Sequence, residues 1–139
     1  MTDSSIHSAA FSPASTYIAS SYYNKRKFHT VLWDLATKTA CIQWISPGEV
    51  HALEFSPDGV WLAAGSNKKK SNFHIQNLLK MQGRTLTAHI GGVTGLSYST
   101  CGNYLVSGGL DKTLRVWRTP EMNEYRVFDE ATWTAPSRS

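Results

Sequence analysis

The chain has 139 residues, a formal net charge of +4 at pH 7 and 41% hydrophobic residues, including five Trp, six Tyr and five Phe. That length corresponds to about one ordinary domain, and the aromatic content can build a packed core, which excludes an intrinsically disordered chain. The mild positive charge favours acidic or phosphate-bearing partners only weakly.

Neither the cysteines nor the apolar residues point to secretion or to a membrane. Cys41 and Cys101 lie in unrelated contexts and form no disulfide framework, which favours a reducing compartment. Residues 1–5 lack the charged start and apolar run of a signal peptide. No apolar run approaches the roughly 20 residues that span a bilayer. We therefore expect an intracellular protein, cytoplasmic or nuclear, with no membrane contact.

Taken in chain order, short apolar and β-branched stretches separated by turn residues predict strands in three groups. The first group occupies residues 6–45, with expected strands at 6–11, 17–21, 28–34 and 39–44 and a long loop at 22–27. The second occupies residues 50–87, with expected strands at 50–55, 61–65, 72–78 and 83–87. The third occupies residues 93–128, with expected strands at 93–98, 104–107, 113–117 and 125–128. Residues 130–139 predict a flexible C-terminal tail.

The three groups are copies of one unit. The segment Phe55-Ser-Pro-Asp-Gly59, followed by Trp61, matches Tyr98-Ser-Thr-Cys-Gly102, followed by Tyr104, and a shorter match begins at Phe11. The two spacings between the matching aromatic residues are 44 and 43 residues. A period of about 40–45 residues is typical of one four-stranded propeller blade.

The third group carries the most specific motif. Ala88-His89, Val106-Ser107-Gly108, Asp111 and Val116-Trp117 follow one another in an order and spacing that resemble the WD-repeat (WD40-like) family. The resemblance covers residues 6 to about 129, and Arg118 stands where the family has Asp. It implies an all-β fold of three four-stranded antiparallel blades, a partial and open β-propeller.

The resemblance also implies a structural tetrad, in which the His bonds a Ser, the Ser bonds an indole N–H and the Asp orients the His. Carried over, these residues are His89, Ser107, Trp117 and Asp111. The first group keeps the equivalents Ser20 and Trp33, whereas the second has Ala64 and Gln76 in their places.

Three blades are fewer than the four to eight that close a propeller. We therefore favour a piece of a longer propeller, and two other interpretations stay open. Copies of the chain could close a ring, two chains giving six blades, or a partner could cap the open side.

Two basic clusters are candidates for partner binding. Both fall between the second and third strands of their groups, and such loops lie on the same face of every blade, so the clusters should share one rim with Lys112. We assign to this surface Tyr22, Tyr23, Lys25, Arg26, Lys27, Lys68, Lys69, Lys70 and Lys112. The alternative is that these loops are Lys-rich only because they face water.

The motifs of catalysis and of cofactor binding are missing from the sequence. His89, Ser107 and Asp111 would suit a hydrolase triad, but no glycine-framed nucleophile elbow surrounds Ser107. The five His residues lack a ligand spacing, and no phosphate-cradling Gly loop occurs. We predict no catalytic residue, no metal site and no cofactor.

The expected function is therefore that of a non-catalytic interaction scaffold or adaptor, which presents loop and rim surfaces to other proteins. The alternative is a basic-loop surface that binds nucleic acid or phosphate-bearing ligands, and its affinity would depend on salt. The sequence does not identify the partner.

Overall fold

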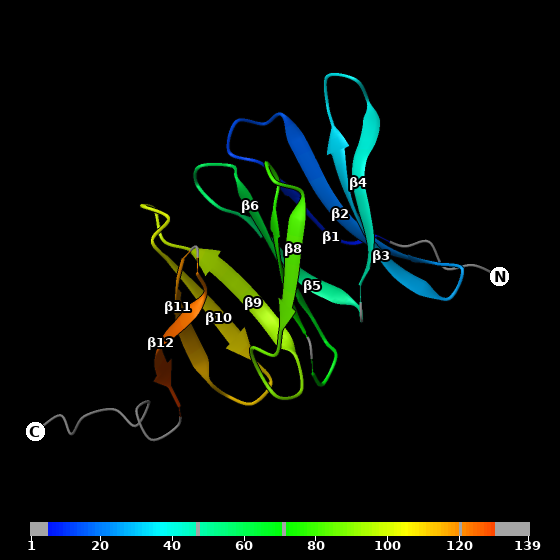
Figure 1. The fold of residues 1–139 in the computed structure, drawn as a ribbon. Helices are drawn as coiled ribbons and strands as arrows, with labels where there is room; N and C mark the ends of the chain where they lie inside the picture. The colour runs from blue at the N-terminus through cyan, green and yellow to red at the C-terminus, as the bar shows by residue number, and fades with distance from the viewer. Residues whose placement is uncertain (1–5, 47, 71, 120, 130–139) are drawn as a thin grey trace, which may run out of the picture.

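The computed structural model describes residues 6–46, 48–70, 72–119 and 121–129, which form three four-stranded antiparallel sheets in chain order (Figure 1). We call them blades 1, 2 and 3. Blade 1 contains β1 (Ile6–Phe11), β2 (Tyr17–Asn24), β3 (Lys27–Asp34) and β4 (Thr39–Ser46). Blade 2 contains β5 (Val50–Phe55), β6 (Trp61–Ser66), β7 (Phe73–Asn77) and β8 (Gln82–Leu86). Blade 3 contains β9 (Val93–Tyr98), β10 (Tyr104–Gly109), β11 (Leu114–Arg118) and β12 (Asn123–Phe128).

This architecture confirms the predicted all-β fold of three open antiparallel blades. The innermost strands β1, β5 and β9 pack side by side, and each sheet runs outward from them. The described part of the chain contains no helix that is long and apolar enough to cross a membrane. The predicted tail at 130–139 lies outside the described residues.

The same hairpin turn is built three times, which explains the repeat seen in the sequence. Ser12, Ser56 and Ser99 each begin the turn between the first two strands of a blade. Their backbone N–H groups donate to the carbonyls of Tyr17, Trp61 and Tyr104 at 3.0, 2.8 and 2.9 Å. Their hydroxyls accept hydrogen bonds from the backbone N–H groups of the same three residues at 3.0, 3.0 and 3.1 Å. One Ser therefore closes each turn with its backbone and its side chain.

The predicted loop at 22–27 is wrong. Strands β2 and β3 continue in register through the pair formed by Asn24 and Lys27. The turn consists of Lys25 and Arg26 alone, whose φ angles are +51° and +65°. Two consecutive positive φ values are typical of the two-residue turn that matches strand twist. Tyr22 and Tyr23, which precede the turn, favour strand because their rings contact aromatic residues on the opposite strand.

Two apolar clusters join the blades. The cluster between blades 1 and 2 contains Ala19, Leu32, Leu53, Phe55 and Leu62, among others, and Ala10 and Trp44 pack against it. The cluster between blades 2 and 3 contains Ala63, Phe73, Val93, Leu105 and Trp117, among others, and Trp61 and Leu96 pack against it. The blades are thus held together by face-to-face burial of apolar side chains.

The outer faces of blades 1 and 3 have no neighbouring sheet among the described residues. Phe11 on blade 1 is 64% exposed, and Tyr104 and Leu114 on blade 3 are exposed as well. Trp33 and Trp117 occupy the same place in their blades, since Trp33 pairs with Ile18 and Trp117 with Leu105. Trp117 faces blade 2 and is 6% exposed, whereas Trp33 faces away from blade 2 and is 39% exposed. The two end faces therefore carry side chains equivalent to those at the interfaces between blades, but no described blade covers them.

These end faces predict self-association of the isolated chain. Exposed apolar surface of this kind is rare on stable monomers, so the average mass measured by light scattering should rise with protein concentration. The double variant Phe11→Glu with Leu114→Glu places one charge on each end face and should keep the monomer mass. Leu79→Glu is the matched control, because Leu79 is exposed but lies on blade 2. A wild-type mass that does not change with concentration would contradict the prediction.

Candidate interaction surface

The connections that carry the basic residues lie along one side of the three blades, which runs in Figure 1 from the bottom centre (β10 to β11) to the right (β2 to β3). Successive strands alternate in direction, so the connection between the second and third strands of each blade returns to this side. The connection from β8 to β9 ends there too. We call this surface the loop face and define it as residues 25–26, 67–70, 72, 87–92 and 110–113.

A buried chain of hydrogen bonds anchors the loop face to blade 3. The imidazole Nε2 of His89 lies 2.7 Å from the Ser107 hydroxyl, which also accepts a hydrogen bond from the Trp117 indole at 3.0 Å. On the other side of the ring, Nδ1 lies 2.9 Å from Asp111 Oδ1 and 2.9 Å from the Thr113 hydroxyl. We call these five side chains the His89 network. The structure thus brings together all four residues assigned to the tetrad and adds Thr113.

The chemistry of two partners fixes the direction of their hydrogen bonds. An indole N–H can only donate, so the Ser107 oxygen accepts from Trp117. A carboxylate can only accept, so Nδ1 of His89 donates to Asp111. Each nitrogen of the imidazole therefore has a hydrogen-bond partner, Ser107 at Nε2 and Asp111 at Nδ1.

Asp111 links the network to the backbone of the loop face. Its Oδ1 accepts hydrogen bonds from the Thr113 hydroxyl at 2.7 Å and the Thr113 N–H at 3.1 Å. Its Oδ2 accepts from the Ile90 N–H at 3.3 Å. Partial burial raises the pKa of the Asp111 carboxyl, but the hydrogen bonds from Thr113 and His89 outweigh it and hold the pKa below its ordinary value.

The other two blades contain only parts of this network. In blade 1 the Trp33 indole donates to the Ser20 hydroxyl at 3.1 Å, on the open outer face. In blade 2 Ala64 offers no hydroxyl, and Gln76 instead bonds His74 through its Oε1 at 3.0 Å from Nε2. The described residues therefore place the complete network in blade 3 alone.

Asn72 is a residue that the sequence reasoning missed. It is 1% exposed, and its amide group donates to the carbonyls of Lys68, at 2.9 Å, and His89. Its Oδ1 accepts from the backbone N–H of Ala88 at 3.1 Å. One side chain thus joins the loop between β6 and β7 to the segment that carries His89. The sequence position could have indicated this role, because Asn72 stands immediately before β7 just as Thr113, a member of the His89 network, stands immediately before β11.

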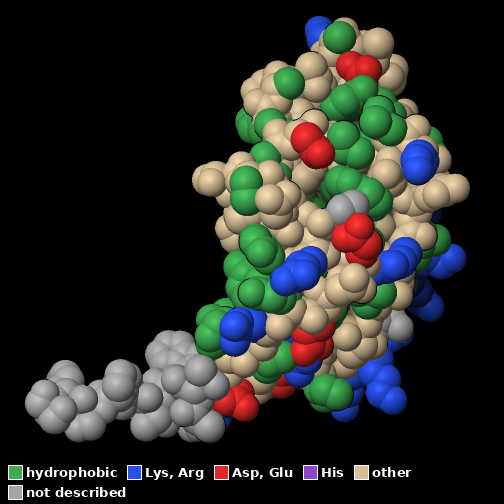
Figure 2. All heavy atoms as spheres, turned by 60° about the vertical axis from the view of Figure 1, so that its left-hand side comes forward, with side chains coloured by type: hydrophobic (Ala, Val, Ile, Leu, Met, Phe, Trp, Pro, Cys, Tyr) green, Lys and Arg blue, Asp and Glu red, His purple; other side chains and the backbone are tan. Residues whose placement is uncertain are grey.

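The basic candidates are exposed. The ion pairs that the structure shows around His51, His89 and Arg115 involve other cations than these. Seven exposed cations add positive charge to the loop face and the adjoining end of β3, namely Lys25, Arg26, Lys27, Lys68, Lys69, Lys70 and Lys112. Figure 2 shows Lys and Arg gathered at the lower right edge of the molecule, with Asp and Glu scattered over the rest of that view.

The two candidate tyrosines lie in strand β2, where their rings pair across the hairpin. Tyr22 stacks on His29 with ring centres 5.1 Å apart, and Tyr23 contacts Phe28 at 4.8 Å. His29 therefore covers one face of the Tyr22 ring, whereas Phe28 packs against Tyr23 at an angle. The hairpin presents its cations on a rigid aromatic support.

Two apolar side chains accompany the lysines. Ile90 is 66% exposed and Leu110 is 62% exposed. The backbone of Leu110 donates to Gly92 at 3.1 Å, and the backbone of Gly91 donates to Lys69 at 3.2 Å. These bonds place the segments that carry Ile90, Leu110 and the lysine loop next to one another on the loop face.

Ser107, His89 and Asp111 are hydrogen-bonded in the order Ser, His, Asp that a hydrolase triad has, but their environment does not suit catalysis. Ser107 is 0% exposed, and its oxygen already accepts the Trp117 N–H. A nucleophile needs an open approach for its substrate. Among the described residues, no group of three or more His, Cys, Asp or Glu side chains is placed to hold a metal ion.

Comparison with known proteins gives a consistent result. The family model described as "WD domain, G-beta repeat" matches residues 40–70 and 80–118. The chain is 32% identical over 88 residues to Protein groucho of Drosophila melanogaster, which covers 63% of this chain and 12% of that protein. It is 28% identical over 103 residues to the small ribosomal subunit protein RACK1y of Oryza sativa subsp. japonica, which covers 70% of this chain and 31% of that protein. The chain thus spans less than a third of the length of these curated relatives.

Solved structures share the fold. The chain superposes on the structure of U3-55K with a TM-score of 0.79 and 21% identity, over 91% of this chain and 39% of that one. It superposes on the WD40 repeats of RRP9 with a TM-score of 0.78 and 22% identity, over the same shares of the two chains.

The His89 network predicts a large stability loss on substitution of Ser107. Ser107→Ala leaves His89 Nε2 and the Trp117 N–H buried without a partner, and each unpaired group costs about 1–3 kcal/mol. We expect the free energy of unfolding, measured by urea denaturation, to fall by about 2–4 kcal/mol. Ser20→Ala is the matched control and should cost about 1 kcal/mol or less, because water can reach Trp33. Equal losses in the two variants would contradict this prediction.

The lowered pKa of Asp111 predicts a pH dependence with a definite sign. A carboxyl whose pKa is lower in the folded than in the unfolded state stabilises the fold above the unfolded-state pKa of about 4, and this contribution disappears as the pH falls through the folded-state pKa. The wild type should therefore lose more stability than Asp111→Asn between about pH 5 and pH 2. Urea denaturation across this range measures the difference. Parallel pH profiles would show that Asp111 does not contribute.

Proposed function

Because the chain belongs to the WD40 family, whose model matches half of its length, we propose that it is a non-catalytic interaction scaffold that binds an acidic surface of a partner protein with its loop face. The observation that carries the proposal is the set of seven exposed cations on the loop face and the adjoining end of β3, together with exposed Ile90 and Leu110 beside the lysine loop of blade 2. Isolated exposed apolar side chains need no explanation, but a group bordered by charge of one sign is typical of an interaction surface.

The loop face is suited to recognition because its segments are held in place. The His89 network fixes the segment before β9 to blade 3, and Asn72 fixes the lysine loop to that same segment. Binding then costs little ordering of the backbone. A rigid sheet scaffold that positions loop side chains is a common arrangement for binding proteins.

We infer a structural rather than a catalytic role for His89, Ser107, Asp111 and Trp117. Burial of Ser107 and His89 supports this inference, as does the complete pairing of their polar atoms. The same burial disfavours an enzyme that would use these residues.

Nucleic acid is the alternative ligand for the cations. Binding of single strands depends on aromatic rings with open faces on which bases stack, whereas Tyr22 is stacked on His29 and Tyr23 packs against Phe28 within the hairpin. The apolar pair Ile90 and Leu110 also suits a protein partner better than a phosphate backbone. We therefore favour a protein partner.

Further blades are the second kind of partner that we propose, either from a longer parent chain or from copies of this one. The exposed Phe11 on one end face and the exposed Leu114 on the other support this proposal. Both would be buried by a neighbouring blade, as Trp117 is by blade 2.

The double variant Lys68→Glu with Lys69→Glu tests the loop face. Fluorescence anisotropy should show salt-dependent binding of a poly-glutamate peptide to the wild type, weakened about tenfold in this variant by the loss of two exposed ion pairs. Lys38→Glu with Arg126→Glu is the matched control, since it reverses the same number of exposed charges outside the loop face. Tighter binding of an oligo-uridine RNA than of the peptide would favour the nucleic-acid alternative and contradict the proposal.

A further inference from the structure

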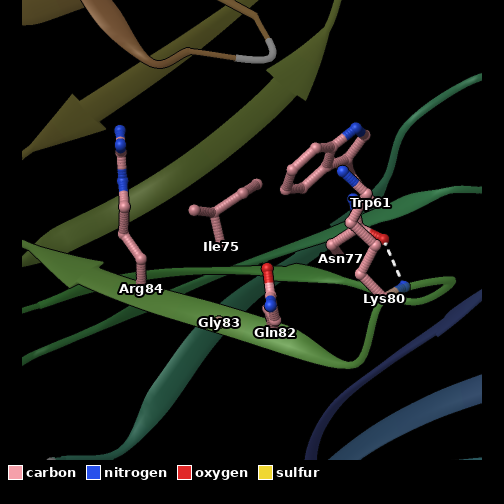
Figure 3. Close-up of a pocket in the computed structure, with 7 residues that line it drawn as sticks. All are labelled: Trp61, Ile75, Asn77, Lys80, Gln82, Gly83 and Arg84. Atoms are coloured by element: carbon pink, nitrogen blue, oxygen red, sulfur yellow. Dashed lines mark hydrogen bonds between the residues drawn. The ribbon is translucent and has the colours of Figure 1, made fainter.

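A groove of about 350 Å³ lies on the face of blade 2 that is turned toward blade 3. Strands β7 and β8 form its floor, the half-buried Trp61 indole supplies exposed apolar surface, and Ile75, which is 2% exposed, closes the bottom (Figure 3). Arg84 stands at one end, and Lys80 lies at the other, beside Asn77. Gln82 and Gly83 complete the lining. This volume is at the lower end of the range of about 300–1,000 Å³ seen for ligand sites.

The two ends of the groove are fixed by hydrogen bonds. The Asn77 Oδ1 accepts from the backbone N–H groups of Leu79 and Lys80 at 2.9 and 2.8 Å, which holds the turn between β7 and β8. At the other end, the Arg84 guanidinium donates to the backbone carbonyl of Glu121 at 2.6 Å, a bond between blades 2 and 3. Because that carbonyl uses only one of the five guanidinium N–H groups, Arg84 retains donors for a ligand.

The charge in the groove has one sign. Lys80 and Arg84 are both exposed, and the lining residues that the structure describes include no Asp or Glu. An apolar floor between two cations is complementary to an apolar side chain between two anions. A nucleic-acid backbone would match the cations but would leave Trp61 and Ile75 without an apolar partner.

We propose that this groove binds a short peptide segment of a partner protein in which an apolar side chain is flanked by acidic residues. The apolar side chain contacts Trp61 and Ile75, and the two carboxylates face Lys80 and Arg84. This site is separate from the loop face, because Lys80 lies in the turn at the opposite end of β7 from Asn72. The proposal therefore adds a second, peptide-binding surface to the proposed scaffold.

Nuclear magnetic resonance on the full chain of 139 residues tests the proposal. The probe is an acetylated and amidated peptide with the order Gly, Glu, Leu, Glu, Gly, and its counterpart carries Gln in place of both Glu residues. Titration with the acidic peptide should shift the indole N–H signal of Trp61, identified with Trp61→Phe, and the side-chain Nε signal of Arg84. The Gln peptide should bind about tenfold more weakly, since two partly exposed ion pairs are lost.

Charge reversal separates the groove from general attraction to a basic protein. Lys80→Glu with Arg84→Glu should weaken about tenfold the affinity for the acidic peptide that is derived from the Trp61 indole shift, whereas Lys68→Glu with Lys69→Glu on the loop face should leave that affinity unchanged. The proposal is overturned if the Trp61 indole signal does not move, if the two peptides bind equally, or if both double variants weaken binding to the same extent. Because the loop-face variant is measured in parallel, failure of the groove does not decide the proposal for the loop face.

Discussion

The hydroxyl of Ser107 is the junction on which the third blade and the loop face depend. Trp117 must bury its indole N–H to fill the space between blades 2 and 3, and a buried donor needs an acceptor. A hydroxyl at this position accepts a hydrogen bond from the indole and is also hydrogen-bonded to Nε2 of His89. The hydrogen bond that Trp117 needs is therefore part of a chain that continues through His89 and Asp111 to the backbone N–H of Ile90 on the loop face. Packing inside the blade and the shape of the surface are set by the same bonds.

The pairing of the strands also differs between the blades that contain this Trp and the blade that lacks it. The register of β3 against β4 shifts between Leu32 and Trp33, and that of β11 against β12 shifts between Val116 and Trp117. In blade 2, where Gln76 replaces the Trp, the pairing of β7 with β8 is regular. A bulge redirects a side chain and increases local twist, so the shift accompanies the large indole and is absent without it. Blade 2 secures its loop differently, through Asn72.

Most of the fold could be predicted from the sequence, because strand patterns and the Ser-closed turns are local. The extension of β2 and β3 over residues 22–27 could not be predicted, because Lys25 and Arg26 are residue types expected in an exposed loop. The strands become evident only from the pairing of Tyr22 and Tyr23 with residues across the hairpin. The same limit applies to the candidate sites. His89, Ser107, Asp111 and Trp117 form a motif with fixed spacing, whereas the groove between Trp61 and Arg84 is lined by residues of three strands of blade 2 that only the folded sheet brings together.

Strand β7 connects the two proposed binding surfaces mechanically. An Asn stands at each end of it: Asn72 holds the loop face, and Asn77 holds the turn with Lys80. The five residues of β7 extend over about 16 Å, and its side chains are fixed in the clusters that join the blades, Phe73 and Ile75 among them. A single compact acidic motif is too small to reach both surfaces, because they lie at opposite ends of a rigid strand. Two separate segments, from one partner or from two, can be held at a constant distance, which is the property that a scaffold requires.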